Sequence, residues 1–245
     1  MPKRGRLIIV GLLTLLAGLI ILFPARVAYN WFAPPGIALN GFEGTVWSGS
    51  ARHMTAGNIY VGNFRWRIKP LRLLTGKLAF AIEGSPSSGF VESEFAIGFG
   101  GDVYLNDLRS SIPVETLEHV SGIQGLRGNA SIRFEWLQLA NGWPVSAKGT
   151  LDVAGLLIPL VAQSPLGDFR AEFFTQEDGV VVSIEDIDAV VDLAGSLRLT
   201  SDRQYQFLGL VAPKPETSQQ IRQQLQFLGS PNERGQYELR NEGQF

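Results

Sequence analysis

The side chains that most often do chemistry in proteins are scarce in this chain. Its 245 residues include no cysteine and only two histidines, His53 and His119. Without cysteine there is no thiol nucleophile, no disulfide bond and no thiolate ligand for a metal. The two histidines lack the H-x-x-x-H and H-E-x-x-H spacings with which a pair on one helix binds zinc. We therefore expect both histidines to be ordinary surface residues.

Two motifs that would indicate catalysis are also absent from the sequence. Gly76-Lys77 looks like the end of a phosphate-binding P-loop, but there is no glycine five positions earlier, and Leu78 follows the lysine. No serine has the Gly-x-Ser-x-Gly surroundings of a nucleophile elbow. The sequence therefore predicts a protein that is not an enzyme, with no catalytic, cofactor-binding or metal-binding residue.

Four carboxylates gather in one stretch of the chain, at Glu185, Asp186, Asp188 and Asp192. They alternate with isoleucine and valine, which is typical of a strand or turn with one solvated face. The stretch lacks the glycine and the spacing of a calcium-binding loop. We favour the solvated face, and a carboxylate pair or calcium site is the alternative.

The charge distribution argues against nucleic acid as a partner. The net charge is −2, from 21 basic and 23 acidic residues. Three of the basic residues, Lys3, Arg4 and Arg6, stand at the N-terminus, so the rest of the chain has 18 basic against 23 acidic residues, a net charge of −5. Trp66–Lys69 mixes aromatic and basic residues as single-strand binders do, but an acidic domain lacks the basic face that nucleic acid needs. An ordinary strand is the favoured interpretation of this segment, and a sheet edge near anionic lipid headgroups is the alternative.

The elements that would position any site begin with an apolar segment. Residues 7–23 read LIIVGLLTLLAGLIILF and carry no charge. We expect a transmembrane helix over 7–28, preceded by a cytoplasmic tail of residues 1–6 whose basic residues set the orientation. A linker over 29–36 begins with aromatic residues suited to the membrane interface and ends with two stiffening prolines. A cleaved signal peptide is the alternative, although the apolar run exceeds the ~7–15 residues of an h-region.

Beyond the linker, the dominant pattern is the alternation of apolar and polar residues that is typical of β-strands. Such runs lie at 58–68, 77–82, 92–99, 130–136, 146–153, 170–174, 180–184, 196–200 and 237–240. One apolar face per strand predicts an antiparallel sheet with one buried side. We therefore expect a mainly β fold, in which the transmembrane helix is followed by a curved antiparallel sheet domain over 37–245, on the periplasmic side.

Two short helices are expected to interrupt the strands. They lie at 114–120 and 217–227, and Ser218 is the expected N-cap of the second. Each is followed by a glycine, a polar turn, a second glycine and a strand. This weak repeat leaves open a division of the domain into two similar halves, about 37–140 and 141–245.

Several motifs together carry a family resemblance. They are the segments Gly44–Ala51 (GTVWSGSA), Trp66–Pro70 (WRIKP), Leu74–Leu78 (LTGKL), Leu225–Gly229 (LQFLG) and Gly235–Gly243 (GQYELRNEG). Together they resemble the type II secretion system protein N family over nearly the whole chain. The resemblance implies an accessory, non-catalytic inner-membrane component of the apparatus that carries folded proteins from the periplasm across the outer membrane.

The resemblance also implies partners and site positions. The partners are other inner-membrane components of the type II secretion system and membrane lipid, without a cofactor or nucleic acid, and self-association is left open. The candidate positions are Gly44, Thr45, Val46, Trp47, Gly49, Trp66, Pro70, Gly76, Gly229 and Gly235.

The motif Gly44–Ala51 also predicts a local structure. Gly44 and Gly49 should bracket a short strand in which Val46 faces opposite to Thr45 and Trp47. Core packing is the favoured role of Trp47, because tryptophan buries a large area. Presentation of its ring to a partner is the alternative.

Lipid handling is the alternative function. A single anchor followed by curled antiparallel sheets with capping helices also resembles the AsmA-like bridge proteins, which present an apolar groove to acyl chains. The concave face of the sheet distinguishes the two functions. An open trough lined by apolar side chains favours lipid, whereas a filled core favours assembly.

Overall fold

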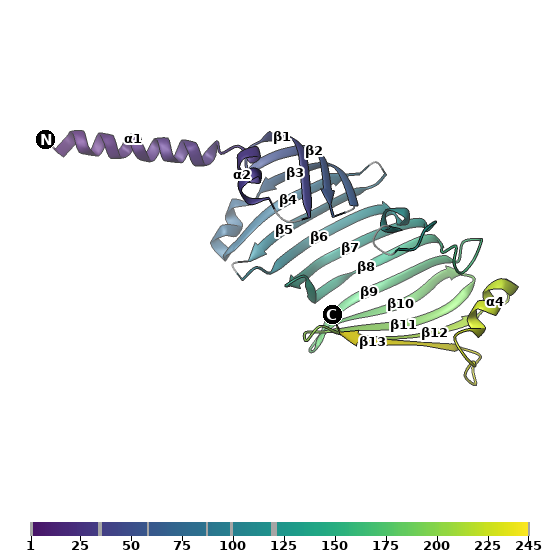
Figure 1. Ribbon diagram of the computed structural model, residues 1–245. Helices are drawn as coiled ribbons and strands as arrows, with labels where there is room; N and C mark the ends of the chain where they lie inside the picture. The colour runs from purple at the N-terminus through teal and green to yellow at the C-terminus, as the bar shows by residue number, and fades with distance from the viewer. Residues whose placement is uncertain are drawn as a thin grey trace.

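The computed structural model describes residues 2–33, 36–57, 59–86, 88–98, 100–118 and 122–244. Its strands form one 13-stranded sheet, in which each strand pairs antiparallel with the next along the chain (Figure 1). This order confirms a mainly β, antiparallel fold. The strands are β1 (Ile37–Gly44), β2 (Ser48–Ala56), β3 (Ile59–Ile68), β4 (Lys77–Ser85), β5 (Phe90–Gly98), β6 (Val103–Pro113), β7 (Arg127–Ala140), β8 (Trp143–Leu157), β9 (Gly167–Gln176), β10 (Gly179–Ala189), β11 (Val191–Thr200), β12 (Gln204–Pro213) and β13 (Tyr237–Gln244).

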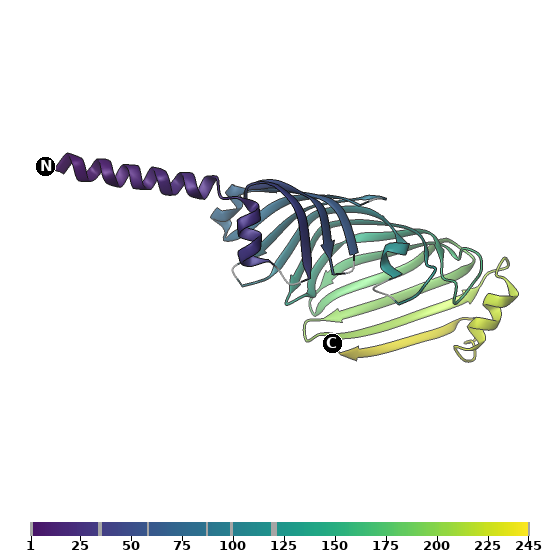
Figure 2. The ribbon, with the colours of Figure 1, turned by 45° about the horizontal axis from the view of Figure 1, so that its top comes forward.

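One face of the sheet is apolar and the other is polar, because side chains alternate along each strand. The pairing register keeps apolar residues on the same side from strand to strand. Phe80 lies opposite Phe95, and Phe95 lies opposite Leu105. Arg133 and Glu172 belong to the polar face, where both lie opposite the same residue of β8. Figures 1 and 2 show that the sheet is twisted and curled, most strongly around β1 to β5.

The N-terminal segment forms two helices, α1 (Pro2–Ile21) and α2 (Ala25–Phe32). The expectation of one continuous helix over 7–28 is therefore wrong. Pro24 interrupts it with φ −67° and ψ 135°, because proline cannot continue the hydrogen bonding of a helix and disfavours helical backbone at the residue before it. Within the described part of the chain, no helix has both the length and the apolar character needed to cross a membrane.

The second helix covers the outer edge of β1. The hydroxyl of Tyr29 donates a hydrogen bond to the carbonyl of Ile37 at 2.7 Å and accepts one from the amide of Leu39 at 3.3 Å. These are backbone groups that a further strand would use if it were added to the sheet. One edge of the sheet is thus covered by α2, and β13 forms the other edge.

The two ends of the strands carry different connections. Short turns and the 3₁₀ helix η1 (Pro70–Thr75) lie at the end where α1 joins the sheet. The longer connections after β6, β8 and β12 all lie at the opposite end (Figure 2). They include the 3₁₀ helix η2 (Val114–Leu117) and α4 (Gln219–Gln226).

Helical residues are found at both places where the sequence predicts a helix among the strands. The side chain of Ser218 accepts a hydrogen bond from the amide of Ile221, which confirms the expected N-cap of α4. The first begins with the four residues of η2 and continues into a helical Glu118. Residues 119–121, and with them His119, lie outside the described residues.

Three apolar clusters form the core of the described structure. One packs α4 against the ends of β11 and β12, one lies in the middle of the sheet, and one packs η2 and the residues after it against β7. Their buried members are Ala162, Leu166, Val191, Val211, Ile221 and Leu225 in the first, Phe134, Ala147, Val180 and Val182 in the second, and Val114, Leu126 and Ala130 in the third. The long connections therefore close the end of the sheet that lies opposite α1.

Candidate functional site

The G-T-V-W-S-G motif forms the turn between β1 and β2. Gly44 and Gly49 are the last pair of this hairpin, and the amide of Thr45 donates a hydrogen bond to the carbonyl of Ser48 at 2.9 Å. Gly44 has a φ of +95°, which residues with a Cβ rarely adopt. The expectation of a short strand between the two glycines is wrong, because the chain reverses direction there.

The turn contacts the C-terminal end of α1 through Trp47. Its indole nitrogen donates a hydrogen bond to the carbonyl of Ile20 at 2.7 Å. The last carbonyls of a helix lack their usual partner four residues later. The carbonyl of Ile20 accepts a long hydrogen bond of 3.3 Å from the amide of Phe23, and Trp47 adds a shorter one. The side chain is half-buried. Its role is therefore to join the sheet to α1, which neither expectation for Trp47 included.

Two backbone contacts complete this connection. The amide of Val46 donates a hydrogen bond to the carbonyl of Phe23 at 3.0 Å. Pro24 forms an isolated β-bridge with Thr45. The contacts hold the end of α1 against the sheet on both sides of the helix break. We call the contacts between residues 20–24 and 45–47 the junction.

Trp66 of β3 supports the junction from within the sheet. Its indole nitrogen lies 3.2 Å from the carbonyl oxygen of Thr45 and 3.1 Å from that of Val46. A Cβ placed on Gly49 would stand 2.5 Å from the Trp66 ring, so glycine leaves the space that this ring occupies. Because β3 lies between β2 and β4, the alternative of a sheet edge for Trp66–Lys69 is wrong.

Pro70 and Gly76 bound the helix η1, which a buried carboxylate holds against the sheet. Pro70 is its first residue, where proline fits without loss of a hydrogen bond, and Gly76 ends it with a φ of +73°. Lys69 is hydrogen-bonded to Glu94 of β5, and Nε of Arg72 lies 2.9 Å from Oε1 of the same carboxylate, whose side chain is 9 % exposed. Burial raises the pKa of Glu94, but the hydrogen bond and charge of Lys69, together with Arg72, outweigh burial and hold this pKa below its ordinary value.

An apolar hollow of about 460 Å³ lies between α2 and the sheet. Its walls come from α2, the junction residue Val46, β1 and β3 to β5. Three strands separate β1 from β5, so the sheet must curl toward its apolar face to bring both to one cavity. Leu78 and Ile97 pair across β4 and β5 and are each 39 % exposed, whereas the other lining residues are more buried. The hollow therefore opens at the strand end that carries η1.

Each polar side-chain group in the walls of the hollow already has a hydrogen-bond partner. Its only polar side-chain atoms are the Tyr29 hydroxyl and the Trp66 indole nitrogen. Both are used in the hydrogen bonds described above. The hollow contains no group suited to catalysis, and its chemistry suits an apolar occupant.

The two C-terminal candidate glycines lie away from the junction. Gly229 follows α4 with a φ of +118°, and Gly235 precedes β13 with a φ of +75°. Both belong to the connection between β12 and β13, at the opposite end of the strands. The candidate residues from Gly44 to Gly76 thus lie around one end of the sheet, whereas Gly229 and Gly235 lie at the other end.

The acidic stretch forms the end of β10 and the start of β11. Asp186 is 11 % exposed, accepts a hydrogen bond from the amide of Leu193 at 2.7 Å, and pairs with Nζ of Lys214 at 2.6 Å. Burial raises the pKa of Asp186, but Lys214 and the amide outweigh burial, so this pKa lies below its ordinary value. Asp186 is therefore a structural ion-pair partner, and the expectation of a solvated carboxylate is wrong for it.

The described residues offer no metal centre. They contain no group of three or more histidine, aspartate or glutamate side chains that could hold an ion. His53 has its Nδ1 at 3.0 Å from the hydroxyl of Tyr60 on the neighbouring strand. This contact lies at the surface, as the sequence predicts for His53.

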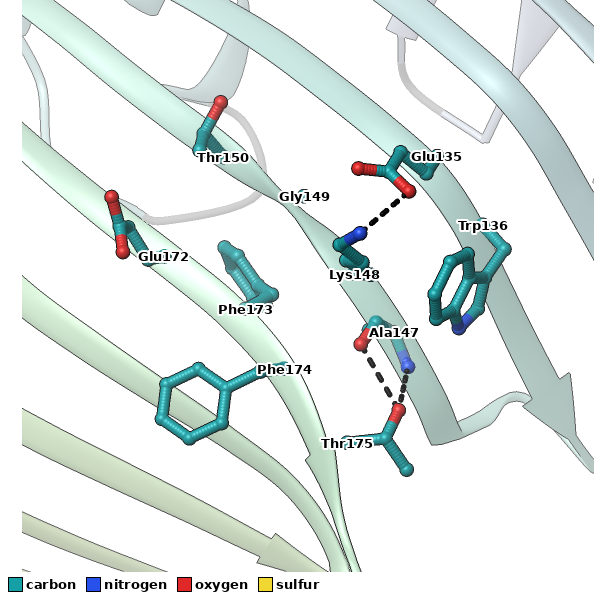
Figure 3. Close-up of a pocket in the computed structure, with 10 residues that line it drawn as sticks. All are labelled: Glu135, Trp136, Ala147, Lys148, Gly149, Thr150, Glu172, Phe173, Phe174 and Thr175. Carbon is teal, nitrogen blue, oxygen red and sulfur yellow. Dashed lines mark hydrogen bonds and ion pairs between the residues drawn. The ribbon is translucent and has the colours of Figure 1, made fainter.

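A second pocket, of about 420 Å³, opens on β7 to β9 (Figure 3). Nζ of Lys148 lies 2.8 Å from Glu135 and 5.3 Å from the centre of the Trp136 ring. Both members of this ion pair are more than half exposed, so water screens their charges. The hydroxyl of Thr175 is hydrogen-bonded to the backbone of Ala147. Among the residues drawn in Figure 3 there is no nucleophile paired with a base, so this pocket does not suit catalysis.

The sequence did not predict the roles of two side chains, Tyr29 and Glu94. The role of Tyr29 at the edge of β1 has no local signal, because its partners are eight and ten residues away. Glu94 shares its strand with the exposed Glu92, and its basic partners Lys69 and Arg72 lie more than twenty residues earlier, so its burial has no local signal either.

The comparisons with known proteins agree on one family. A family model described as type II secretion system (T2SS), protein N, matches residues 35–240. The type II secretion system protein N of Aeromonas hydrophila is 25% identical over 240 residues, which covers 95% of each chain. That of Vibrio cholerae is 28% identical over 238 residues, which covers 94% of each chain. No solved structure was found to match the chain. The chain therefore belongs to the type II secretion system protein N family.

Proposed function

We propose that this protein is a non-catalytic, accessory component of the type II secretion apparatus, anchored in the bacterial inner membrane. It contributes to the assembly that exports folded proteins from the periplasm across the outer membrane. Family membership supports the secretion role. The observation that carries the anchoring role is the junction, because it fixes the sheet to an exposed apolar helix through Trp47 and Val46.

The proposed anchor is α1, with the N-terminus in the cytoplasm and the sheet in the periplasm. Its leucine and isoleucine side chains from Leu7 to Ile21 are all at least half exposed, so nothing in the described structure covers them. A helix that is apolar on all sides is stable when lipid or protein surrounds it. Residues 7–21 rise about 22 Å as a helix, less than the ~30 Å of a bilayer core. Local thinning of the bilayer and snorkelling of Arg26 would accommodate this difference.

The geometry of the sheet suggests where the partners bind. Because α2 covers the edge at β1, β13 is the edge at which a partner strand can be added. The partners that we propose are other inner-membrane components of the secretion system. Self-association through the same edge is a further route by which the sheet could extend.

Lipid transport along the whole sheet receives less support than assembly. A lipid conduit needs a continuous apolar trough, whereas side chains of the core clusters pack over the apolar face from β6 onward in the described structure. The open apolar space is the hollow, which involves β1 and β3 to β5. The concave face is thus mostly filled, and this favours the assembly function.

The test of the proposed function is the location of exported enzymes in a deletion strain. Retention of folded, signal-cleaved cargo in the periplasm, restored to secretion by the wild-type chain, is the expected result. A Gly44→Val, Gly49→Val chain should fail to restore secretion, because both side chains would collide with the hairpin backbone. A Gly100→Ala chain is the control, because its Cβ meets open space. Normal secretion in the deletion strain, or full restoration by the double variant, would contradict the proposal.

Topology is tested separately from secretion. Alkaline phosphatase fused to the C-terminus should be active, because this enzyme folds only outside the cytoplasm, and the chain should remain with the membrane fraction. An inactive fusion combined with an active cytoplasmic reporter at the same position would overturn the orientation.

A further inference from the structure

We infer that the hollow between α2 and β1 to β5 binds one acyl chain of an inner-membrane phospholipid. This inference rests on the proposed anchoring of α1 in that membrane. It goes beyond the assembly function, because it gives the protein a defined lipid ligand next to its anchor.

The chemistry of the walls selects an apolar chain. Eleven of the 13 lining residues are alanine, valine, leucine, isoleucine or phenylalanine. The remaining two, Tyr29 and Trp66, already bind backbone groups of the same protein. A polar ligand would lose its hydrogen bonds to water and gain none from these walls, which is unfavourable. The volume of about 460 Å³ falls within the ~300–1,000 Å³ that is usual for small-molecule sites.

The position of the hollow indicates that the apolar chain bound there belongs to a membrane lipid. The hollow opens at Leu78 and Ile97, at the strand end where the junction holds α1. One of its walls begins at Ala25, immediately after the bridge that Pro24 makes with the turn. Phospholipid chains surrounding the anchor therefore lie next to the opening.

The surroundings of the opening add a second observation. The helix η1 lies at the same strand end, and its residues Leu71 and Leu74 are 79 % and 86 % exposed. Exposed leucines of this kind suit the boundary between headgroups and acyl chains. Lys69 before η1 and Arg72 within it bind Glu94 and keep η1 in place. The opening and these leucines thus lie at the same end of the strands, which is the end where α1 joins the sheet.

Photocrosslinking in membranes tests the inference directly. The photoreactive residue benzoylphenylalanine replaces Phe80, which lines the hollow. The matched control carries it at Phe174, which lies on the polar face and is 38 % exposed. Irradiation of inner membranes that contain the full chain should give a phospholipid adduct at Phe80, identified by its mass, and little or none at Phe174.

A blocking variant tests whether the adduct comes from the hollow. Ala28→Trp fills the space from α2, whereas Ala38→Trp adds the same side chain to an exposed position on β1. We expect Ala28→Trp to lower the adduct yield at Phe80 roughly ten-fold, which corresponds to about 1.4 kcal/mol of binding free energy, and Ala38→Trp to leave it unchanged. If Ala28→Trp does not fold, as judged by its thermal unfolding, Leu78→Trp blocks the opening at a more exposed site.

The outcomes separate this inference from the proposed function. If the chain stays in the membrane fraction but gives no lipid adduct at Phe80, the inference is wrong and the anchor stands. An adduct with a polypeptide in place of lipid would also overturn it, because the hollow would then bind a protein partner. If the chain leaves the membrane fraction, the proposed anchor fails. Equal lipid adducts at Phe80 and Phe174, or no effect of either blocking variant, would refute binding in the hollow.

Discussion

Gly49 offers the sharpest test of how the motif turn works. In the native hairpin it lies opposite Gly44, and the Trp66 ring packs over it. A Cβ added to Gly49 would stand 2.5 Å from the carbonyl oxygen of Glu43 and 2.5 Å from the Trp66 ring. Real Cβ atoms do not approach other heavy atoms so closely. In a Gly49→Ala chain either the hairpin backbone or the Trp66 ring must therefore move.

The cost of that movement can be worked out from its two parts. Forcing an extra methyl group into a packed site costs about 1–3 kcal/mol. If the Trp66 ring moves away, its indole nitrogen also loses the carbonyls of Thr45 and Val46, which costs about 1 kcal/mol. The sum is about 2–4 kcal/mol, which lowers the midpoint of thermal unfolding by roughly 5–15 °C for a domain of this size.

Thermal unfolding of the full chain in detergent, followed by tryptophan fluorescence, measures this shift. Gly100→Ala is the matched control, because a Cβ at that residue meets nothing within 4 Å, and its stability should stay within about 0.5 kcal/mol of wild type. Wild-type stability in Gly49→Ala, or the same small shift in both variants, would refute the close packing of Trp66 against this turn.

Three other contacts can each be tested by one substitution. Trp47→Phe removes the hydrogen bond to Ile20, so the amide of Val46 should exchange with solvent faster, whereas Trp136→Phe should leave that amide unchanged. Tyr29→Phe removes the cover of the β1 edge, so the amide of Leu39 should exchange faster and self-association should increase, with Tyr60→Phe as the control. Asp186 has a pKa below its ordinary value. Its ion pair therefore stabilises the fold fully at pH values above the unfolded pKa of about 3.9. This stabilisation is lost as the pH falls through the pKa of Asp186 in the folded protein. The stability advantage of wild type over Asp186→Asn, measured by urea unfolding, should therefore be present at pH 7 and shrink in acid, and a constant difference would contradict the role of the pair.

The sequence pattern located most of the sheet, and the strands that it missed depart from strict alternation. Nine predicted runs coincide with β3 to β5, β7 to β11 and β13. Two of the four missed strands contain a register shift, after Ala51 in β2 and at Asp107 in β6, and β1 contains Gly41 with a left-handed φ of +72°. A bulge shifts the alternation of side chains by one residue, so a test for strict alternation fails across it. In β12 the exposed Leu208 on the polar face hides the alternation instead.

The candidate site was predictable in its location but not in its contacts. The glycine spacing from Gly44 to Gly49 is visible in the sequence, but it predicted a short strand where the structure has a turn. The partners of Trp47 and Val46 lie more than twenty residues earlier, in a segment expected to be one unbroken membrane helix. Pro24 indicates a break in the helix, but the long apolar run before it favoured the prediction of one membrane helix.

The order of the strands has a consequence for how the anchor and the partners can act together. The strands follow one another from β1, beside the junction, to β13 at the free edge. Neighbouring strands lie about 4.8 Å apart, so twelve spacings separate the two edges by roughly 58 Å along the curled sheet. A partner strand bound at β13 would therefore lie far from α1 and from the hollow. Loss of the last strand should abolish pairing at that edge without releasing the chain from the membrane, whereas changes at the junction should affect the position of the whole sheet. Mutations can therefore affect the β13 edge and the junction separately. A partner that had to bind both would need to extend along most of the sheet.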